Sequence, residues 1–160
     1  MPVFNLTGDN DPFLHVSLAK GEKIYCESNA MVMMETSLEL KGRMSGGIGA
    51  ALMRTFANGE SFFQQHIEAV RGDGDCLLSP TLPGAMQILD VGARQYMISD
   101  GAFVAASASV ELKVRTQSLG NALFAQSGGF FITETAGNGQ LVVSGFGTIS
   151  ELEVRPARIS

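Results

Sequence analysis

Short segments in which polar and apolar residues alternate recur along the chain. Residues 37–41 and 109–115 alternate with a period of two, the pattern of a strand with one buried face. Other short segments rich in β-branched or aromatic residues occupy 13–18, 24–27, 62–70, 76–79, 86–91 and 130–135. Turn-forming residues separate many of them, as at 20–22, 72–75 and 137–139. Strands this close together predict an all-β sandwich, barrel or prism, because alternating strands and helices would need longer segments between the strands.

Two segments interrupt this β pattern at equivalent places. Residues 49–56 and 119–125 are good helix formers, each about two turns long. Ile48, just before the first of them, falls on one helical face with Leu52 and Phe56. We therefore expect each segment to form a short helix that caps the sheets.

The second half of the chain repeats the order of the first. Ser37–Lys41 returns as Ser109–Lys113, and Tyr25 corresponds to Tyr96 after a slip of one residue. Further matches in the same order are 30–32 with 102–104, 62–63 with 130–131, 77–79 with 142–144, and 89–91 with 152–154. We therefore predict a single domain over residues 1–160, built from β units at about 12–91 and 92–154.

Composition narrows the class of protein. The 160 residues suit one domain with its own core, and the net charge of −5 argues against nucleic acid as a partner, since phosphate binding needs clustered Lys and Arg. No apolar run reaches the length of a transmembrane helix, and no basic and apolar export signal is visible at the N-terminus. We expect Cys26 and Cys76 to be reduced, buried thiols and the protein to be cytoplasmic.

The chain offers no recognisable set of metal ligands. His15 and His66 lie in different predicted strands, and neither belongs to a closely spaced histidine pair. Cys26 and Cys76 do not form a Cys-x-x-Cys motif, and residues 73–75 lack the bidentate glutamate of a calcium loop. We predict neither a bound metal nor a cofactor.

Catalytic motifs are equally hard to find. Ser45–Gly49 leads into a predicted helix but lacks the lysine of a phosphate-binding P-loop, and Gly59–Phe63 lacks the closing glycine of a nucleophile elbow. Glu39 and Glu111 each lie close to a lysine on an alternating strand, which indicates a solvated charged face. We therefore assign no catalytic residue. Whether the protein is an enzyme stays open, and a non-catalytic role is favoured.

Two aromatic pairs are the best signal of an interface. Neighbouring side chains of one strand point to opposite faces, so both members of Phe62-Phe63, or of Phe130-Phe131, cannot enter the same core. One phenylalanine of each pair must face another layer, a helix or a second subunit. We take Phe62, Phe63, Phe130 and Phe131 as candidate interface residues.

Several motifs together resemble a known family. Asn29–Met34, Gly59–Phe63, Leu78–Gly84 and Asp100–Ala105 are similar to a widespread bacterial family of unknown function, whose eukaryotic relatives are the altered-inheritance-of-mitochondria proteins of mitochondrial biogenesis. The resemblance runs from about residue 12 to residue 154, and Asn29 stands where a glycine is common. It implies a fold like that of the tryptophan RNA-binding attenuation protein, with no established activity, cofactor or catalytic residue. Family members usually continue into a third related unit, which these residues lack.

These observations predict a non-catalytic binding or assembly module. Unpaired strand edges left by a missing third unit imply either a longer gene product or an obligate homo-oligomer, and the partner would be a protein or a small apolar ligand. The alternative is a small-molecule carrier or an enzyme with a pocket between the two repeats, to which Glu39, Glu111 or Ser79 would contribute polar contacts. Membrane-surface association through 48–56 is disfavoured, since that segment lacks a basic face.

Overall fold

The protein folds into β-strands joined by turns. The computed structural model describes residues 1–8, 10–44, 63–99, 101–116 and 131–153. Thirteen strands lie in this part of the chain: β1 (Val3–Thr7), β2 (Phe13–Leu18), β3 (Lys23–Glu27), β4 (Met31–Met34), β5 (Leu38–Met44), β6 (Phe63–Ala69), β7 (Gly74–Leu78), β8 (Gly84–Val91), β9 (Met97–Ser99), β10 (Phe103–Ser107), β11 (Val110–Thr116), β12 (Phe131–Gly137) and β13 (Gly139–Phe146). The predicted all-β class is confirmed. The segments 49–56 and 119–125, expected to form capping helices, lie outside the described residues, which contain no helix.

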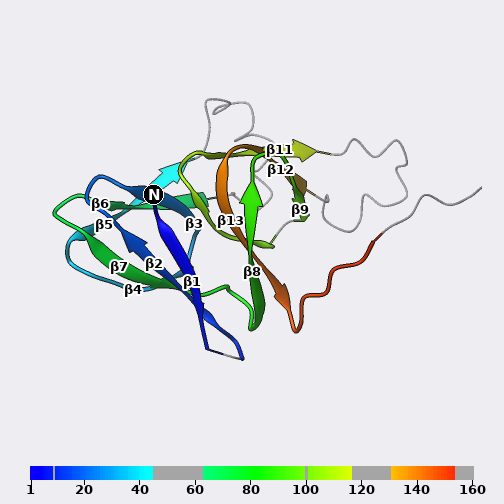
Figure 1. Cartoon of the computed structure of the whole chain (residues 1–160), viewed down its shortest axis with the longest axis horizontal. Helices are drawn as coiled ribbons and strands as arrows, with labels where there is room; N and C mark the ends of the chain where they lie inside the picture. Colours follow the sequence, from blue (N-terminus) through cyan, green and yellow to red (C-terminus); the bar gives the residue numbers. More distant parts are fainter. Residues whose placement is uncertain (9, 45–62, 100, 117–130, 154–160) are drawn as a thin grey trace, which may run out of the picture.

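The strands form three antiparallel sheets (Figure 1). Their orders are β1-β2-β7-β4, β5-β6-β3-β10-β13-β8 and β11-β12-β9. Buried side chains from β2, β3 and β6, among them Leu14, Ile24 and Ile67, pack into one core. A second core joins β8, β9 and β13 through Val91, Ile98 and Leu141. The result is a sandwich-like arrangement with one core toward each end of the long central sheet.

The same pattern of strand pairing occurs twice. β7 lies between β2 and β4, as β13 lies between β8 and β10. β6 lies between β5 and β3, as β12 lies between β11 and β9. We call β2–β7 the N-terminal set and β8–β13 the C-terminal set; in Figure 1 they occupy the left and right sides. By hydrogen bonding β8 goes with β13, although the predicted boundary after residue 91 places it in the first unit.

The two sets also match in fine detail. A β-bulge interrupts β4 between Met31 and Met33, and an equivalent one interrupts β10 between Phe103 and Ala105. The amide of Ser79 donates to the carbonyl of Ala30, and the amide of Ser144 to that of Ala102, both at 2.8 Å. These contacts set the correspondence between β4 and β10 residue by residue.

The register of β9 differs from the one predicted. In the N-terminal set, Tyr25 of β3 lies opposite His66 of β6, which lies opposite Lys41 of β5. In the C-terminal set, Met97 of β9 lies opposite Glu134 of β12, which lies opposite Lys113 of β11. Met97 therefore occupies the place of Tyr25, and the predicted match of Tyr25 with Tyr96 is wrong by one residue. In the corrected register, buried Cys26 corresponds to buried Ile98.

One pairing joins the two sets into a continuous sheet. β3 of the N-terminal set runs antiparallel to β10 of the C-terminal set, with Cys26 opposite Ala105 and Tyr25 opposite Ala106. We call this β3·β10 pairing the junction. Both alanines and Cys26 are fully buried, so the junction lies in the interior of the protein.

Candidate functional site

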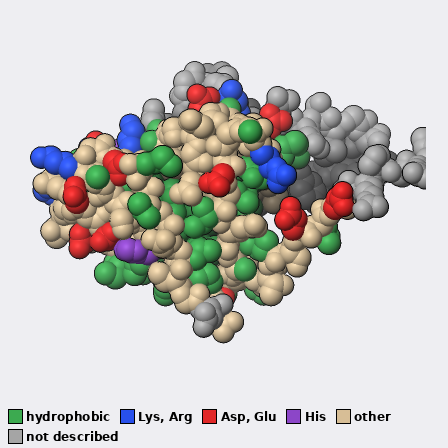
Figure 2. Space-filling model, in the orientation of Figure 1, with side chains coloured by type: hydrophobic (Ala, Val, Ile, Leu, Met, Phe, Trp, Pro, Cys, Tyr) green, Lys and Arg blue, Asp and Glu red, His purple; other side chains and the backbone are tan. Residues whose placement is uncertain are grey.

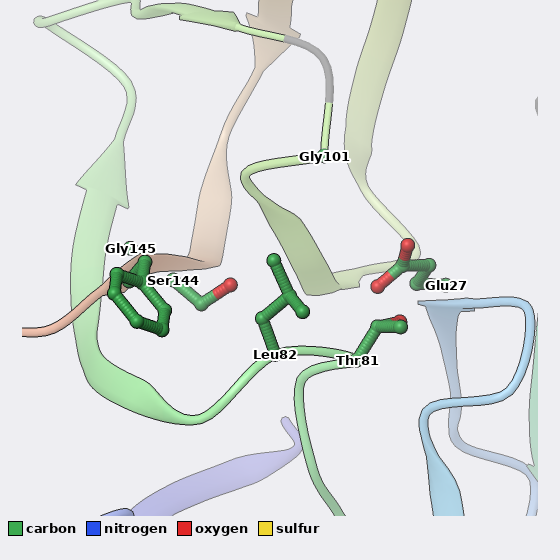
Figure 3. Close-up of a pocket in the computed structure, with 7 residues that line it drawn as sticks. Glu27, Thr81, Leu82, Gly101, Ser144 and Gly145 are labelled. Carbon is green, nitrogen blue, oxygen red and sulfur yellow. The ribbon is translucent and has the colours of Figure 1, made fainter.

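A cleft of about 240 Å³ lies where the two sets meet. Its lining residues are Glu27, Thr81, Leu82, Gly101, Ser144, Gly145 and Phe146. They come from the end of β3, the connection between β7 and β8, the turn between β9 and β10, and the end of β13. Figure 3 shows Leu82 rising between Ser144 on one side and Thr81 and Glu27 on the other.

Glycines shape the wall of the cleft. Gly84 has a φ of 154° at the start of β8, and a Cβ atom there would collide with the carbonyl oxygen of Gly145. This close approach holds the end of β13 against the start of β8. Phe146 lies between Gly145 and Gly147, and the φ of Gly147 is 79°. Phe146 is 81% exposed.

The lining combines apolar and polar groups. Leu82 is 63% exposed, so it and Phe146 form an open apolar wall. The carboxylate of Glu27 and the hydroxyls of Thr81 and Ser144 supply polar groups. Sites for drug-sized ligands are typically ~300–1,000 Å³. The cleft therefore suits a small molecule or one inserted side chain.

The polar residues proposed from the sequence lie elsewhere. The carboxylate of Glu39 is 3.5 Å from the ammonium group of Lys41, and that of Glu111 is 3.7 Å from Lys113. Both pairs are exposed, as a solvated charged face requires. The hydroxyl of Ser79 donates to the carbonyl of Pro80 at 3.3 Å. The expectation that Glu39, Glu111 or Ser79 would line a pocket between the repeats is wrong for this cleft.

The four candidate interface phenylalanines fall at the limits of the described residues. Phe62 and Phe130 lie outside them. Phe63 and Phe131 begin β6 and β12, and only their backbones are described. Phe63 pairs with Met44 and Phe131 with Thr116, which are equivalent positions of the two sets.

The histidines and cysteines do not converge on one site. Nε2 of His15 lies 3.5 Å from Oδ1 of Asp75, whereas His66 belongs to a different sheet. Cys26 and Cys76 are free and buried, and burial raises the pKa of each thiol to about 12. Over the described ranges, no group of three or more His, Cys, Asp or Glu residues is placed to hold a metal ion.

Sequence reasoning missed the residues of the cleft. Thr81 and Leu82 belong to the Leu78–Gly84 motif, which drew attention only as a family resemblance. Phe146 stands between two glycines, a local sign of an exposed aromatic side chain. Nothing local connects these segments with Glu27, because the cleft forms only when the junction brings β3 beside the C-terminal set.

The fold and its cleft define a class: an all-β protein with two sandwich-like sets of strands that share one sheet. Within the described residues, no helix is long and apolar enough to cross a membrane. Residues 4–159 match the family described as "Mitochondrial biogenesis AIM24". The chain belongs to this AIM24 family, as its motifs indicated.

Two relatives from Streptococcus pyogenes support the assignment. An uncharacterised protein of serotype M6 is 34% identical over 147 residues, which cover 88% of this chain and 59% of the relative. The X-ray crystal structure of an S. pyogenes protein is similar, with a TM-score of 0.75 and 30% identity, over 92% of this chain and 66% of that one. This chain therefore spans about three fifths of the curated relative that it matches.

Proposed function

We propose that this chain is a non-catalytic assembly module that self-associates. The observation that carries the proposal is the exposure of apolar side chains on strands that end their sheets. β4 ends one sheet with Val32 and Met33 exposed by 50% and 58%, and β9 ends another with Met97 exposed by 63%. An apolar strand at the edge of a sheet is a template for pairing with another chain.

Further exposed apolar side chains lie outside these two strands. Figure 2 shows hydrophobic side chains at the surface, some of them beside the visible histidine. Val3 of β1 is exposed by 51% and Phe13 of β2 by 42%. Leu6, Leu82 and Phe146 are further exposed apolar residues in the part of the chain whose side chains the structure describes. Such surface favours contact with a second subunit, another protein or a small apolar ligand.

Sedimentation equilibrium over a wide range of concentration tests self-association. We expect the mass to exceed that of one chain and the association to persist at high salt, because the exposed groups are apolar. A matched control is Leu152→Ser, which removes an exposed apolar side chain outside the strands and the cleft and leaves both edge strands unchanged. A single-chain mass at every concentration would contradict the proposal.

We also place the protein in the cytoplasm. The support is the pair of free thiols, Cys26 and Cys76, because proteins of reducing compartments keep their cysteines unpaired. Imaging of the tagged protein in its own host tests this location, and export to the cell surface would contradict it.

A small-molecule carrier or an enzyme is the second candidate function, favoured by the cleft between the two sets. Native mass spectrometry of protein purified from its own source would reveal a bound ligand as added mass. The substitution Leu82→Trp fills the cleft and should remove that mass, whereas Val3→Ser, on an outer face, should retain it. Protein without added mass would leave only the assembly proposal.

A further inference from the structure

We propose that copies of this chain associate head to tail, with β9 of one copy pairing antiparallel with β4 of the next. The pairing would reproduce between chains the junction that β3 and β10 form within the chain. This inference rests on the proposed self-association and specifies its surfaces and register.

The first step is the equivalence of the strands. β3 and β9 hold the same place: β3 lies beside β6 in the group β5-β6-β3, and β9 lies beside β12 in the group β11-β12-β9. β4 and β10 also hold the same place, and both carry the bulge described above. Within the chain, β3 of one set pairs with β10 of the other. The partners left over are β9 and β4, and each ends its sheet.

The second step is the register. In the junction Tyr25 pairs with Ala106. The counterpart of Tyr25 is Met97, and that of Ala106 is Met34. Met97 of one copy should therefore lie opposite Met34 of the next. The backbone agrees with this pairing. The amide of Thr135 donates to the carbonyl of Tyr96 at 2.9 Å, so by alternation the polar groups of Met97 point away from β12. The amide of Glu35 donates to the carbonyl of Asp75 at 3.0 Å. By the same alternation, the backbone amide and carbonyl of Met34 point away from β7.

The third step compares burial at equivalent positions. Val104 and Ala105 of β10 are fully buried in the first core, most of whose members come from the N-terminal set that β10 joins at the junction. Their counterparts Val32 and Met33 of β4 are half exposed or more. Among the described residues, the same positions are therefore buried where the junction exists and exposed where its equivalent is missing.

The fourth step is the absence of protection at these edges. Natural proteins blunt exposed strand edges with charged residues or proline. Neither β4 nor β9 contains either kind of residue, whereas the edge strands β5 and β11 carry Glu39, Lys41, Glu111 and Lys113. The edge strand β8 carries Asp90. The edge strand β1 also lacks charge and proline, but it has no counterpart in the C-terminal set, whereas the unprotected edges of β4 and β9 complement each other.

A second copy of the chain is the occupant that fits. Each copy carries one β9 edge and one β4 edge, and the two are different surfaces. A contact between them is therefore heterologous, and it propagates from copy to copy until a ring closes or sterics end it.

Blocking each edge separately tests the arrangement. Met33→Lys places a charge where its counterpart Ala105 is buried in the junction, so it should close the β4 edge. Met97→Pro removes the outward amide of β9 and should close that edge. Both side chains are exposed in the single chain, and the amide of Met97 points away from β12, so we expect the fold to tolerate the changes. Leu152→Lys, at an exposed apolar position outside the strands and the cleft, is the control.

Each blocked variant alone should sediment as a single chain, since it retains only one type of edge. A mixture of the two should form a complex of two chains, because one supplies β9 and the other β4. The control should associate like the unmodified protein. Restored association on mixing also shows that both variants are folded.

A crosslink tests the register independently of the blocking variants. Directly opposed residues in an antiparallel hydrogen-bonded pair have Cα atoms about 5.5 Å apart, within the reach of a disulfide. Met34→Cys and Met97→Cys, mixed and oxidised with oxidised glutathione, should therefore yield a heterodimer that neither forms alone. The native thiols are buried and should not react.

The outcomes separate this inference from the proposed function. If the unmodified chain associates, but the blocked variants associate equally well and the mixed cysteines do not crosslink, head-to-tail pairing is wrong and assembly stands. Homodimers from either cysteine variant alone would indicate a symmetric contact and overturn the inference. An unmodified chain that stays single at every concentration would overturn both.

Discussion

Asn29 and Gly101 occupy the same place in two equivalent turns, with φ values of 74° and 77°. In each turn the next amide closes the loop: Ala30 donates to the carbonyl of Glu27, and Ala102 to that of Ser99, both at 3.2 Å. Both turns thus require the left-handed backbone region. Asparagine tolerates this region better than most residues with a side chain, which explains how it fills the place that Gly101 has in the other turn.

Substitutions at Asn29 should follow this backbone requirement. We expect Asn29→Ala to lower the free energy of unfolding by about 1–2 kcal/mol, the cost of the left-handed conformation for an ordinary L-residue. Asn29→Gly should retain the stability. Gly101→Ala should cost about as much as Asn29→Ala, because a Cβ there meets no atom within 4 Å and only the backbone is strained. Urea denaturation measures all three, and equal stability of the two alanine variants and the unmodified protein would contradict the argument.

Gly84 should be among the least replaceable glycines of the described chain. A Cβ at this position would meet the backbone of Gly145 and Gly147, and its φ of 154° is unfavourable for other residues. We expect Gly84→Ala to cost about 2 kcal/mol or more, since the backbone of β13 cannot move aside without losing its pairing with β8. Gly72→Ala is the matched control, because a Cβ there has open space. Thermal unfolding should separate the two variants clearly; similar melting temperatures would refute the proposed constraint.

The thiols of Cys26 and Cys76 should be inert in the folded protein. Burial raises the pKa of each from an ordinary value of 9.0 to about 12, so little thiolate exists at neutral pH. We expect a thiol reagent such as dithionitrobenzoate to label neither cysteine at pH 8 until denaturant is added. Rapid labelling without denaturant would show that the core opens.

The same shift predicts a loss of stability in alkali. A thiol whose pKa is higher in the folded than in the unfolded state stabilises the fold below the unfolded pKa. That contribution falls as the pH rises from about 9 toward 12. Cys26→Ala should flatten this part of the pH profile of unfolding, whereas a change at an exposed residue that does not titrate, such as Gln87→Ala, should leave the profile intact.

The aromatic pairs remain a testable interface. If one phenylalanine of each pair is buried, its replacement by alanine should cost about 3–5 kcal/mol, the range for large core deletions. The other member should change the mass of the assembly more than the melting temperature. Sedimentation and thermal unfolding of Phe62→Ala, Phe63→Ala, Phe130→Ala and Phe131→Ala distinguish the two roles, and four variants that change neither property would remove these residues from any interface.

Local periodicity was sufficient to find many of the strands. The predicted strand at 13–18 coincides with β2, and those at 37–41 and 130–135 overlap β5 and β12. The alternation is visible there because one face of each strand is buried. Five strands were not predicted: β1, β4, β9, β10 and β13. β1 carries four exposed residues and β9 is only three residues long, whereas β4, β10 and β13 show no alternation of burial.

Strand partners and the cleft depend on contacts between distant residues. A short motif at Leu89–Val91 led to the assignment of β8 to the first unit, but its hydrogen bonds go to β13, some fifty residues further along. Glu27 and Ser144 are even further apart in sequence, and both line the cleft. Periodicity reports which face of a strand is buried, whereas it contains no information on which strand lies next to it.

The junction also ties the two hydrophobic cores together. The first core contains Val104, Ala105 and Val142 from the C-terminal set, and Tyr25 from the N-terminal set packs against the second. Neither half encloses its interior with its own residues alone. The N-terminal and C-terminal sets should therefore unfold together as one cooperative unit. A protease cut in the loop between β7 and β8 should leave two fragments that remain bound to each other.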